Sequence, residues 1–297
     1  MRRILVPLDG SPLSETAVPY AKALATGTGC ELSLLSVWEV LPEELETVGE
    51  AHARVLRDQG MRYFHTYLGN IAAALEDDCF VSCEVRAGHP AFEIMLAAAE
   101  LDADFIVMAS HGRRGAAERR RGSVADKVLR GSTVSVLIIG PQGLERWPQE
   151  RVGLRSILVP LDGSAESETA LPVAAEIARA TGARMSLLRA VPSVLGRFEI
   201  GLPESFPPDV DVRLVKEAKA YLKRVQGRYS DLVDKATVER GLPAQVVLEA
   251  TERDSPDLVV MASRSRFAAD RWALGSVADE VIEGPVPVLL VHPAAAA

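Results

Sequence analysis

The sequence predicts an α/β protein of two doubly wound domains, each a five-stranded parallel sheet flanked by helices. Two observations carry this prediction: the chain repeats itself at a constant offset, and each copy alternates apolar strands with amphipathic helices. Strands joined by helical crossovers pair in parallel, and the helices then cover both faces of the sheet. At 297 residues the chain is long enough for two such cores.

The two copies keep an offset of 153 residues at four anchors spread along the chain. Four pairs of segments show it: 3–17 with 156–170, 87–94 with 240–247, 103–110 with 256–263, and 122–131 with 275–284. Residues 140–153 are rich in glycine, proline and charge and have no apolar period, which is typical of a linker. We therefore expect a first domain over 1–140, a linker over 141–155 and a second domain over 156–297.

Within the first copy, apolar runs and helix signals predict the order of the elements. Strands are expected at 3–8, 30–38, 80–87, 104–110 and 133–140. Helices are expected from about Pro12 to Thr26, ended by Gly27, then over roughly 43–77, and from Pro90, since proline is favoured at the first helical position. Ser123 is expected to be the N-cap of a last helix, because its hydroxyl can accept a hydrogen bond from a first-turn amide.

The composition disfavours several classes of protein. A net charge of −8 argues against a nucleic-acid partner, because contact with the phosphate backbone requires a basic face. No uncharged apolar run reaches the ~18 residues that span a bilayer, so no membrane partner is expected, and a cytoplasmic location follows by elimination. Cys30, Cys79 and Cys83 lack metal-ligand spacing and are expected to be reduced; a redox pair of Cys79 and Cys83 is the alternative.

Ligands of doubly wound sheets bind beyond the carboxyl ends of the strands, where the strand order reverses. This rule places PLDGS (7–11) and MASHG (108–112) on the functional edge, which we call the rim. Gly112 and Gly122 then flank nine residues, five of them arginine. Arginines beside a helix start suit a polyphosphate, since amide groups, the helix dipole and guanidinium groups all favour anions. The alternative is a solvated surface loop followed by an ordinary helix cap.

Other side chains of the rim allow more than one interpretation. Asp9 and Asp162 end the first strand of each copy, where a carboxylate could serve the base or ribose end of a nucleotide or stabilise its own turn. His111 is expected to face solvent, and no rim serine has an activating partner, so no catalytic residue is assigned. No Walker-type phosphate loop, dinucleotide fingerprint or zinc spacing is present, so no metal site is assigned.

The segments ILVPLDGS (4–11), DFIVMASHG (104–112) and GSVADKVLR (122–130) together resemble the universal stress protein family in its tandem two-domain form. The resemblance covers both copies and implies a strand order of 3-2-1-4-5. The ATP-binding branch of the family carries G-x2-G-x9-G-[ST]. This motif falls on Ala109, Gly112, Gly122 and Ser123, with the spacing kept and alanine in place of the first glycine.

The resemblance implies that ATP binds at the rim, with Mg²⁺ carried by its phosphates. By this likeness Asp9 and Val37 border the adenine, Pro7, Met108 and Ala109 line the adenosine pocket, and Gly112, Gly122, Ser123 and Val124 hold the phosphates. The second copy offers Pro160, Asp162, Met261, Ala262, Ser265, Gly275, Ser276 and Val277. Its site is expected to be partly degenerate. Ser265 replaces a glycine whose missing Cβ leaves room for phosphates, and Ala190 stands where the first copy has Val37.

The resemblance also implies an internal pseudo-dimer, in which the two copies pair through the apolar strands at 134–140 and 286–293, and it allows a homodimer of chains. Residues 201–209 are interpreted as a proline-rich loop over the second rim. The implied function is a nucleotide-dependent stress or signalling module. Two alternatives stay open: a scaffold that works through protein contacts or an apolar ligand without nucleotide, and a slow ATPase.

Overall fold

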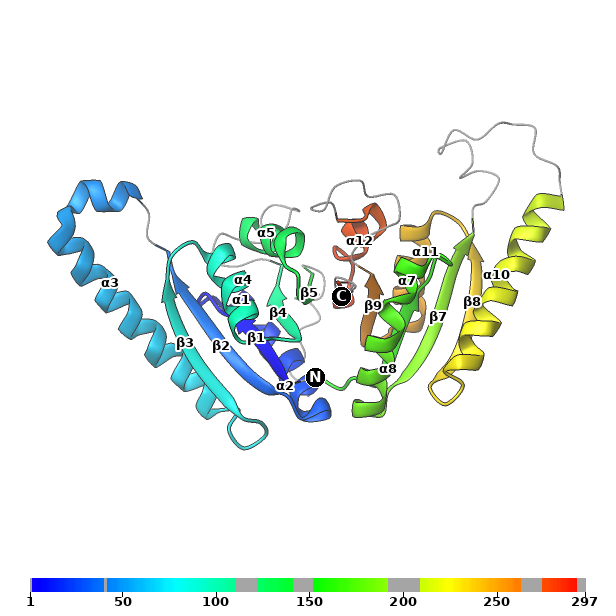
Figure 1. Ribbon diagram of the computed structural model, residues 1–297, viewed down its shortest axis with the longest axis horizontal. Coiled ribbons are helices and arrows are strands. Elements are labelled where there is room, and N and C mark those ends of the chain that lie inside the picture. The colour runs from blue at the N-terminus through cyan, green and yellow to red at the C-terminus, as the bar shows by residue number, and fades with distance from the viewer. Residues whose placement is uncertain are drawn as a thin grey trace. The chain divides into compact units, whose positions relative to one another are not determined.

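A computed structural model describes residues 2–39, 42–110, 122–140, 152–191, 209–262 and 274–292 of the chain. The chain divides into two compact units, Met1–Val152 and Gly153–Ala297. Each unit is an α/β domain in which the sheet is parallel, so the predicted fold class is confirmed (Figure 1).

The first unit contains a five-stranded sheet in the order β3-β2-β1-β4-β5, as the family resemblance implies. Its strands are β1 (Arg3–Pro7), β2 (Glu31–Trp38), β3 (Val81–Ala87), β4 (Phe105–Ala109) and β5 (Ser135–Ile139). Its helices are α1 (Pro12–Glu15), α2 (Ala17–Thr28), α3 (Pro42–Ala73), α4 (Pro90–Glu100) and α5 (Ser123–Gly131).

The second unit repeats this design with the strand order β8-β7-β6-β9-β10. Its strands are β6 (Ser156–Pro160), β7 (Arg184–Val191), β8 (Val233–Arg240), β9 (Leu258–Ala262) and β10 (Val288–Val291). Its helices are α7 (Ala165–Glu168), α8 (Ala170–Thr181), α10 (Asp209–Arg228), α11 (Pro243–Asp254) and α12 (Ser276–Val281).

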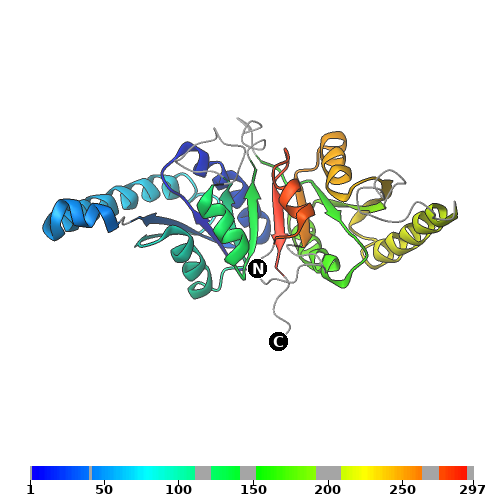
Figure 2. The same ribbon diagram turned by 90° about the horizontal axis from the view of Figure 1, so that it is seen from above.

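Helices cover both faces of each sheet. In the first unit α2 packs on β1 and β4 and α3 packs on β2 and β3, whereas α4 packs on β1, β2 and α5. Right-handed crossovers place α2 and α3 on one face and α4 and α5 on the other, because the direction of travel along the sheet reverses after β3. Figure 2 shows helices on both sides of each sheet.

The central strands are the core of each unit. All five residues of β4 are buried, and Ile4, Leu5 and Val6 of β1 are fully buried. Each fully buried side chain of this size contributes about 1.5–3 kcal/mol relative to an exposed one, so these strands dominate the stability of the unit. Polar groups on these strands are therefore confined to the places where the strands end.

Two details of the sequence interpretation are wrong. The helix expected to stop at Gly27 continues to Thr28, and Gly29 ends it with a left-handed backbone at φ 73°, donating its amide to the Ala25 carbonyl at 2.7 Å. A glycine can remain within a helix at modest cost, whereas the left-handed C-cap strongly prefers one. The N-cap of α5 is Gly122, and Ser123 is its first helical residue.

Gly60 allows α3 to lie close to the end of β2. A Cβ on Gly60 would lie 2.2 Å from two ring atoms of Trp38, whereas a Cβ on Gly69 of the same helix would meet nothing within 4 Å. The Trp38 ring also meets Phe64 edge-on, with 6.4 Å between the ring centroids. Glycine at position 60 is therefore a packing requirement of this helix.

Alanine at these two glycines should change stability in opposite directions. Gly69→Ala is expected to raise the free energy of unfolding by about 0.5–1 kcal/mol, since alanine is the better helix former. Gly60→Ala is expected to lower it by about 1–3 kcal/mol, because the Trp38 ring must move. Urea unfolding followed by circular dichroism measures both. Equal effects of the two substitutions would contradict the close packing of Trp38 on α3.

The three cysteines are all thiols in the structure. Burial raises the pKa of the Cys79 thiol, and burial together with Glu76 raises that of Cys83. A thiol is reactive as its thiolate, so a raised pKa makes both groups poor nucleophiles at neutral pH. These environments do not favour the redox pair that the sequence left open.

Alkylation should therefore be slow at neutral pH. At pH 7.5 the exposed Cys83 is expected to react with iodoacetamide more slowly than glutathione does. Its rate should keep rising at pH values where an ordinary thiol is already ionised, because its folded-state pKa is the higher one. Mass spectrometry of timed samples gives the rate at each pH. Faster reaction of Cys83 than of glutathione at pH 7.5 would contradict this environment.

Candidate functional site

The carboxyl ends of β1 and β4 form the rim of the first unit. β1 lies between β2 and β4 in the sheet, and its two neighbours are reached by connections that run in opposite directions. A crevice opens at such a point, because the connections leave it on different sides. Pro7 ends β1 and Met108 and Ala109 end β4, all three buried, while the half-buried Asp9 follows β1. These predicted residues therefore lie along one edge.

Asp9 stabilises the turn that follows β1. Its Oδ1 accepts hydrogen bonds from the Ser11 amide at 2.9 Å and the Ser11 hydroxyl at 2.6 Å. The Ser11 hydroxyl in turn accepts from the Ser14 amide at 3.1 Å and so caps α1. This is the turn role that the sequence left open for Asp9, and the bonds hold its carboxylate in one orientation at the rim.

The second unit contains the same turn. The Oδ1 of Asp162 accepts from the Ser164 amide at 2.8 Å and from the Ser164 hydroxyl, and that hydroxyl caps α7 by accepting from the Ser167 amide at 3.1 Å. Gly163 lies in this turn at φ 85°, a backbone conformation that favours glycine. The repeated LDGS segment therefore has the same local structure in both copies.

Gly122 and Ser110 tie the start of α5 to the end of β4. The Gly122 amide donates to the Ser110 carbonyl at 2.8 Å, and the Ser110 amide donates to the Ile139 carbonyl at 2.9 Å. Ser110 is completely buried, so both bonds are shielded from water. The start of α5 is therefore fixed beside the carboxyl end of β4.

The first turn of α5 presents amide groups at the rim. Within the described part of the chain no side chain caps this helix, and the Gly122 carbonyl accepts the first helical bond, from Asp126 at 3.0 Å. The amides of Ser123, Val124 and Ala125 accordingly have no intrahelical acceptor. The acidic residue of its first turn, Asp126, has its carboxylate held by the Arg130 guanidinium at 3.0 Å. A helix start of this kind favours an anion.

The corresponding helix of the second unit has a different charge. Gly275 is the N-cap of α12 and again no side chain caps it among the described residues. However, Glu280 and Glu283 stand where α5 has Lys127 and Arg130. The helix start is thus kept while its surroundings become acidic, which weakens the attraction of a phosphate to it.

The other predicted residues of the second copy occupy the expected places. Pro160 ends β6, Asp162 follows it, Met261 and Ala262 end β9, Ser276 and Val277 open α12, and Val37 and Ala190 lie half-buried near the ends of β2 and β7. Gly112, Ser265, His111, the arginines at 113–121 and residues 201–208 lie outside the described residues.

A tyrosine of the long helix approaches the rim in both units, and sequence reasoning missed it. The hydroxyl of Tyr67 on α3 is buried near Glu15, and burial first and then Glu15 raise its pKa. Tyr221 on α10 stands in the same relation to Glu168, which is 153 residues from Glu15. An aromatic residue on the inner face of a helix looks like any core residue in sequence, so only the fold reveals this pairing.

The two copies also differ near the end of the second strand. Ser36 of β2 is completely buried, and its hydroxyl donates to the Leu8 carbonyl at 2.7 Å. At the same offset β7 has the half-buried Arg189, whose guanidinium carbon lies 4.8 Å from the centre of the Tyr221 ring. Sequence reasoning compared only the neighbouring position and so missed this replacement, although the constant offset contained it.

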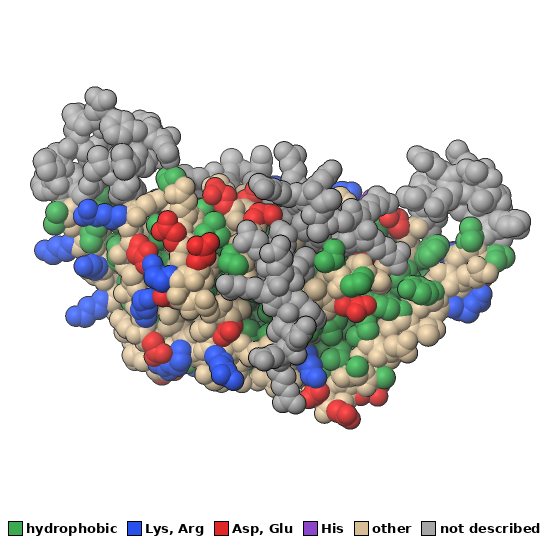
Figure 3. Space-filling model, turned by 180° about the vertical axis from the view of Figure 1, so that it is seen from behind, with side chains coloured by type: hydrophobic (Ala, Val, Ile, Leu, Met, Phe, Trp, Pro, Cys, Tyr) green, Lys and Arg blue, Asp and Glu red, His purple; other side chains and the backbone are tan. Residues whose placement is uncertain are grey.

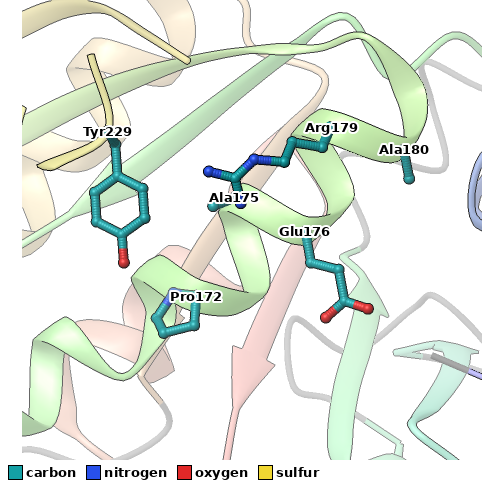
Figure 4. Close-up of a pocket in the computed structure, with 6 residues that line it drawn as sticks. All are labelled: Pro172, Ala175, Glu176, Arg179, Ala180 and Tyr229. Atoms are coloured by element: carbon teal, nitrogen blue, oxygen red, sulfur yellow. The ribbon is translucent and has the colours of Figure 1, made fainter. Parts of the chain in front are cut away.

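A shallow pocket of about 610 Å³ lies elsewhere on the second unit (Figure 4). It is lined by α8 residues and by Tyr229, which follows α10: Pro172, Ala175, Glu176, Arg179, Ala180 and Tyr229. The end of α8 and Tyr229 lead into the starts of β7 and β8, so this pocket is at the opposite end of the strands from the rim. It does not belong to the site built by the strand ends.

Among the described residues no group of three or more His, Cys, Asp or Glu is arranged to hold a metal ion. In the described part of the chain, no helix is long and apolar enough to cross a bilayer.

Comparison with known structures shows the same fold. A universal stress protein from Archaeoglobus fulgidus superposes with a TM-score of 0.69 over 97% of this chain and 95% of that one, at 23% sequence identity. A putative universal stress protein from Pseudomonas aeruginosa matches with a TM-score of 0.67 over 98% and 93%, at 16% identity. At such identities the likeness concerns the fold.

Sequence comparison identifies the family. A universal stress protein of Thermus aquaticus is 34% identical over 144 residues, which are 46% of this chain and 98% of that protein. One from Methanocaldococcus jannaschii is 32% identical over 141 residues, 46% of this chain and 81% of that protein. The model of the universal stress protein family matches residues 1–140 and again residues 153–292. With both copies matched in this way, the chain belongs to the universal stress protein family, in a tandem arrangement.

Proposed function

We propose that the first unit binds ATP at its rim and that the chain works as a nucleotide-dependent stress or signalling module. The hydrogen bond from the Gly122 amide to the Ser110 carbonyl carries the proposal. It holds the start of α5, which no described side chain caps, at the carboxyl end of β4. A doubly wound sheet receives nucleotides at this place.

The start of α5 fits the phosphates of ATP. Three amides without intrahelical acceptors, those of Ser123, Val124 and Ala125, lie at the positive end of the helix dipole. Lys127 and Arg130 add positive charge on the same helix, and Arg130 offsets the carboxylate of Asp126. A polyphosphate would thus meet both donors and a favourable potential, and Mg²⁺ would arrive with the phosphates.

The strand ends fit the adenosine. Pro7, Met108 and Ala109 supply buried apolar surface, and Val37 is half-buried at the neighbouring strand. The Asp9 carboxylate, oriented by Ser11, is an acceptor for ribose hydroxyl or base amino groups. In this unit the Asp9 carboxylate at β1 and the helix start at β4 therefore give the rim a nucleoside end and a phosphate end.

The second unit is the weaker candidate for ATP. Its helix start lies among Asp279, Glu280 and Glu283, and Arg189 replaces the buried Ser36. These differences favour the scaffold alternative, or another ligand, for this half. Pairing of β5 with β10, a homodimer of chains and a cytoplasmic location stay predictions.

Gly122→Val is expected to abolish ATP binding. The backbone of Gly122, at φ −59° and ψ 146°, is open to valine, so the fold should survive while the side chain crowds the phosphates. At 100 times its dissociation constant ATP should stabilise the wild-type fold by about 2.7 kcal/mol. Thermal unfolding with and without millimolar ATP measures this, together with chromatography of nucleotide released from the denatured protein.

Gly275→Val is the matched control, because it places the same side chain at the same position of the second unit. It is expected to leave the ATP-dependent stabilisation almost unchanged. Absence of released nucleotide, combined with a melting temperature that millimolar ATP does not raise, would falsify the proposal. If Gly275→Val loses the ATP-dependent stabilisation and Gly122→Val keeps it, the ATP site lies in the second unit.

A further inference from the structure

Arg189 is held at the carboxyl end of β7 in a way that Ser36 of the first unit is not. A Cβ on Gly163 would be 3.0 Å from each of the Arg189 atoms Cζ, Nη1 and Nη2, so the face of the guanidinium lies against this glycine. The Tyr221 ring is its second support, at 4.8 Å. Because the face of the group is packed, its edge of N–H donors is what remains for hydrogen bonding.

No carboxylate pairs with this guanidinium in the described part of the chain. The nearby Glu168 is the partner of Arg228, with 2.5 Å between the oxygen and the guanidinium nitrogen. A half-buried cation without a counter-ion is unusual, since buried charge is normally paired. Arg224 lies on α10, one turn after Tyr221, and its guanidinium carbon is 5.9 Å from the centre of the Tyr221 ring. It also has no carboxylate partner among the described residues.

The surroundings of these arginines are strongly basic. Between Val212 and Arg228 helix α10 carries six Lys or Arg and one Glu, in a chain whose net charge is −8. Figure 3 shows blue side chains along the edge of the second unit where α10 lies, at the left of that view. A local concentration of one sign of charge attracts small ions of the opposite sign.

The first unit keeps only one of these six positive charges at the equivalent place, as Arg62 in the position of Lys216. When Tyr67 and Tyr221 are matched, Asn70 and Ala74 take the positions of Arg224 and Arg228. On the helices that begin at the rim, the first unit is the more basic one: α5 has Lys127 and Arg130 where α12 and the residues after it have Glu280 and Glu283. Among the described residues of the second unit, positive charge is therefore gathered around Tyr221 and not on α12.

We propose that Arg189 and Arg224, arranged around Tyr221 beside the Gly163 turn, form a binding site for a phosphate-bearing small molecule. The site is separate from the start of α5 and does not depend on ATP binding there. An edge of guanidinium donors matches phosphate oxygens in a bidentate manner, and two arginines that have no carboxylate partner among the described residues match an ion of at least two negative charges. The second unit accordingly takes a different ligand from the first.

Titration calorimetry with inorganic pyrophosphate tests the site in the full-length protein. The wild type is expected to bind, and Arg189→Ser, which installs the serine of the first unit, should weaken binding at least about tenfold through loss of charge-assisted bonds. Arg224→Ser, at an exposed position that cannot disturb the core, should weaken it about threefold. Arg189→Lys should fall between the wild type and Arg189→Ser, because lysine keeps the charge without the fork.

Arg184→Ser is the control, since it removes the same charge from the other end of β7, where Arg184 pairs with Asp234. Its affinity for pyrophosphate should stay within about twofold of the wild type, because the charge is distant and solvated. All the titrations are repeated in the Gly122→Val background, which removes pyrophosphate binding at the start of α5; binding should persist there and should still be weakened by Arg189→Ser and Arg224→Ser. Absence of binding by the wild type, or equal weakening by Arg189→Ser and Arg184→Ser, overturns the proposal.

Discussion

Burial of the parallel strands on both faces is the constraint on which the rest of each unit depends. β4 is buried along its whole length and the middle of β1 is completely buried, so neither strand has room for a polar side chain until it ends. Asp9 and Ser110 stand just beyond these strands, and helix α5 starts there because the Gly122 amide bonds to the Ser110 carbonyl. On such a scaffold the polar side chains that could bind a ligand lie at the rim.

Duplication has left the scaffold unchanged and altered its charges. Both units keep the Asx turn, the tyrosine–glutamate approach and the glycine N-cap at the rim. The first unit has basic residues after its helix start, and the second has acidic ones there with arginines around Tyr221. Side chains at the rim can diverge because they contribute little to the core, so two copies of one fold can serve different anions.

Most elements could be predicted from sequence, and the misses have local causes. Strands that are apolar throughout and helices opened by proline, such as α4 at Pro90, are strong signals. The sequence interpretation ends a helix at Gly27, but Gly29 lies only two residues further on, and the positive φ of Gly29 shows that it is the residue that ends the helix. Ser123 was taken as an N-cap because serine favours that position, whereas Gly122 holds it through its bond to Ser110. That bond joins the two ends of the connection between β4 and α5, a contact that no residue propensity encodes.

The fold class, the duplication and, through the family likeness, the strand order could be read from the order of residues, whereas the rim as the place of the site stays a prediction. These depend on periodicity and repetition, which a linear chain displays directly. Only the tertiary structure decided that Asp9 is bound into its turn, that Trp38 lies on Gly60, and that Arg189 lies between Gly163 and Tyr221. Such contacts join residues far apart in the chain, and they arise from the packing of helices on the sheet, which the order of residues alone does not show.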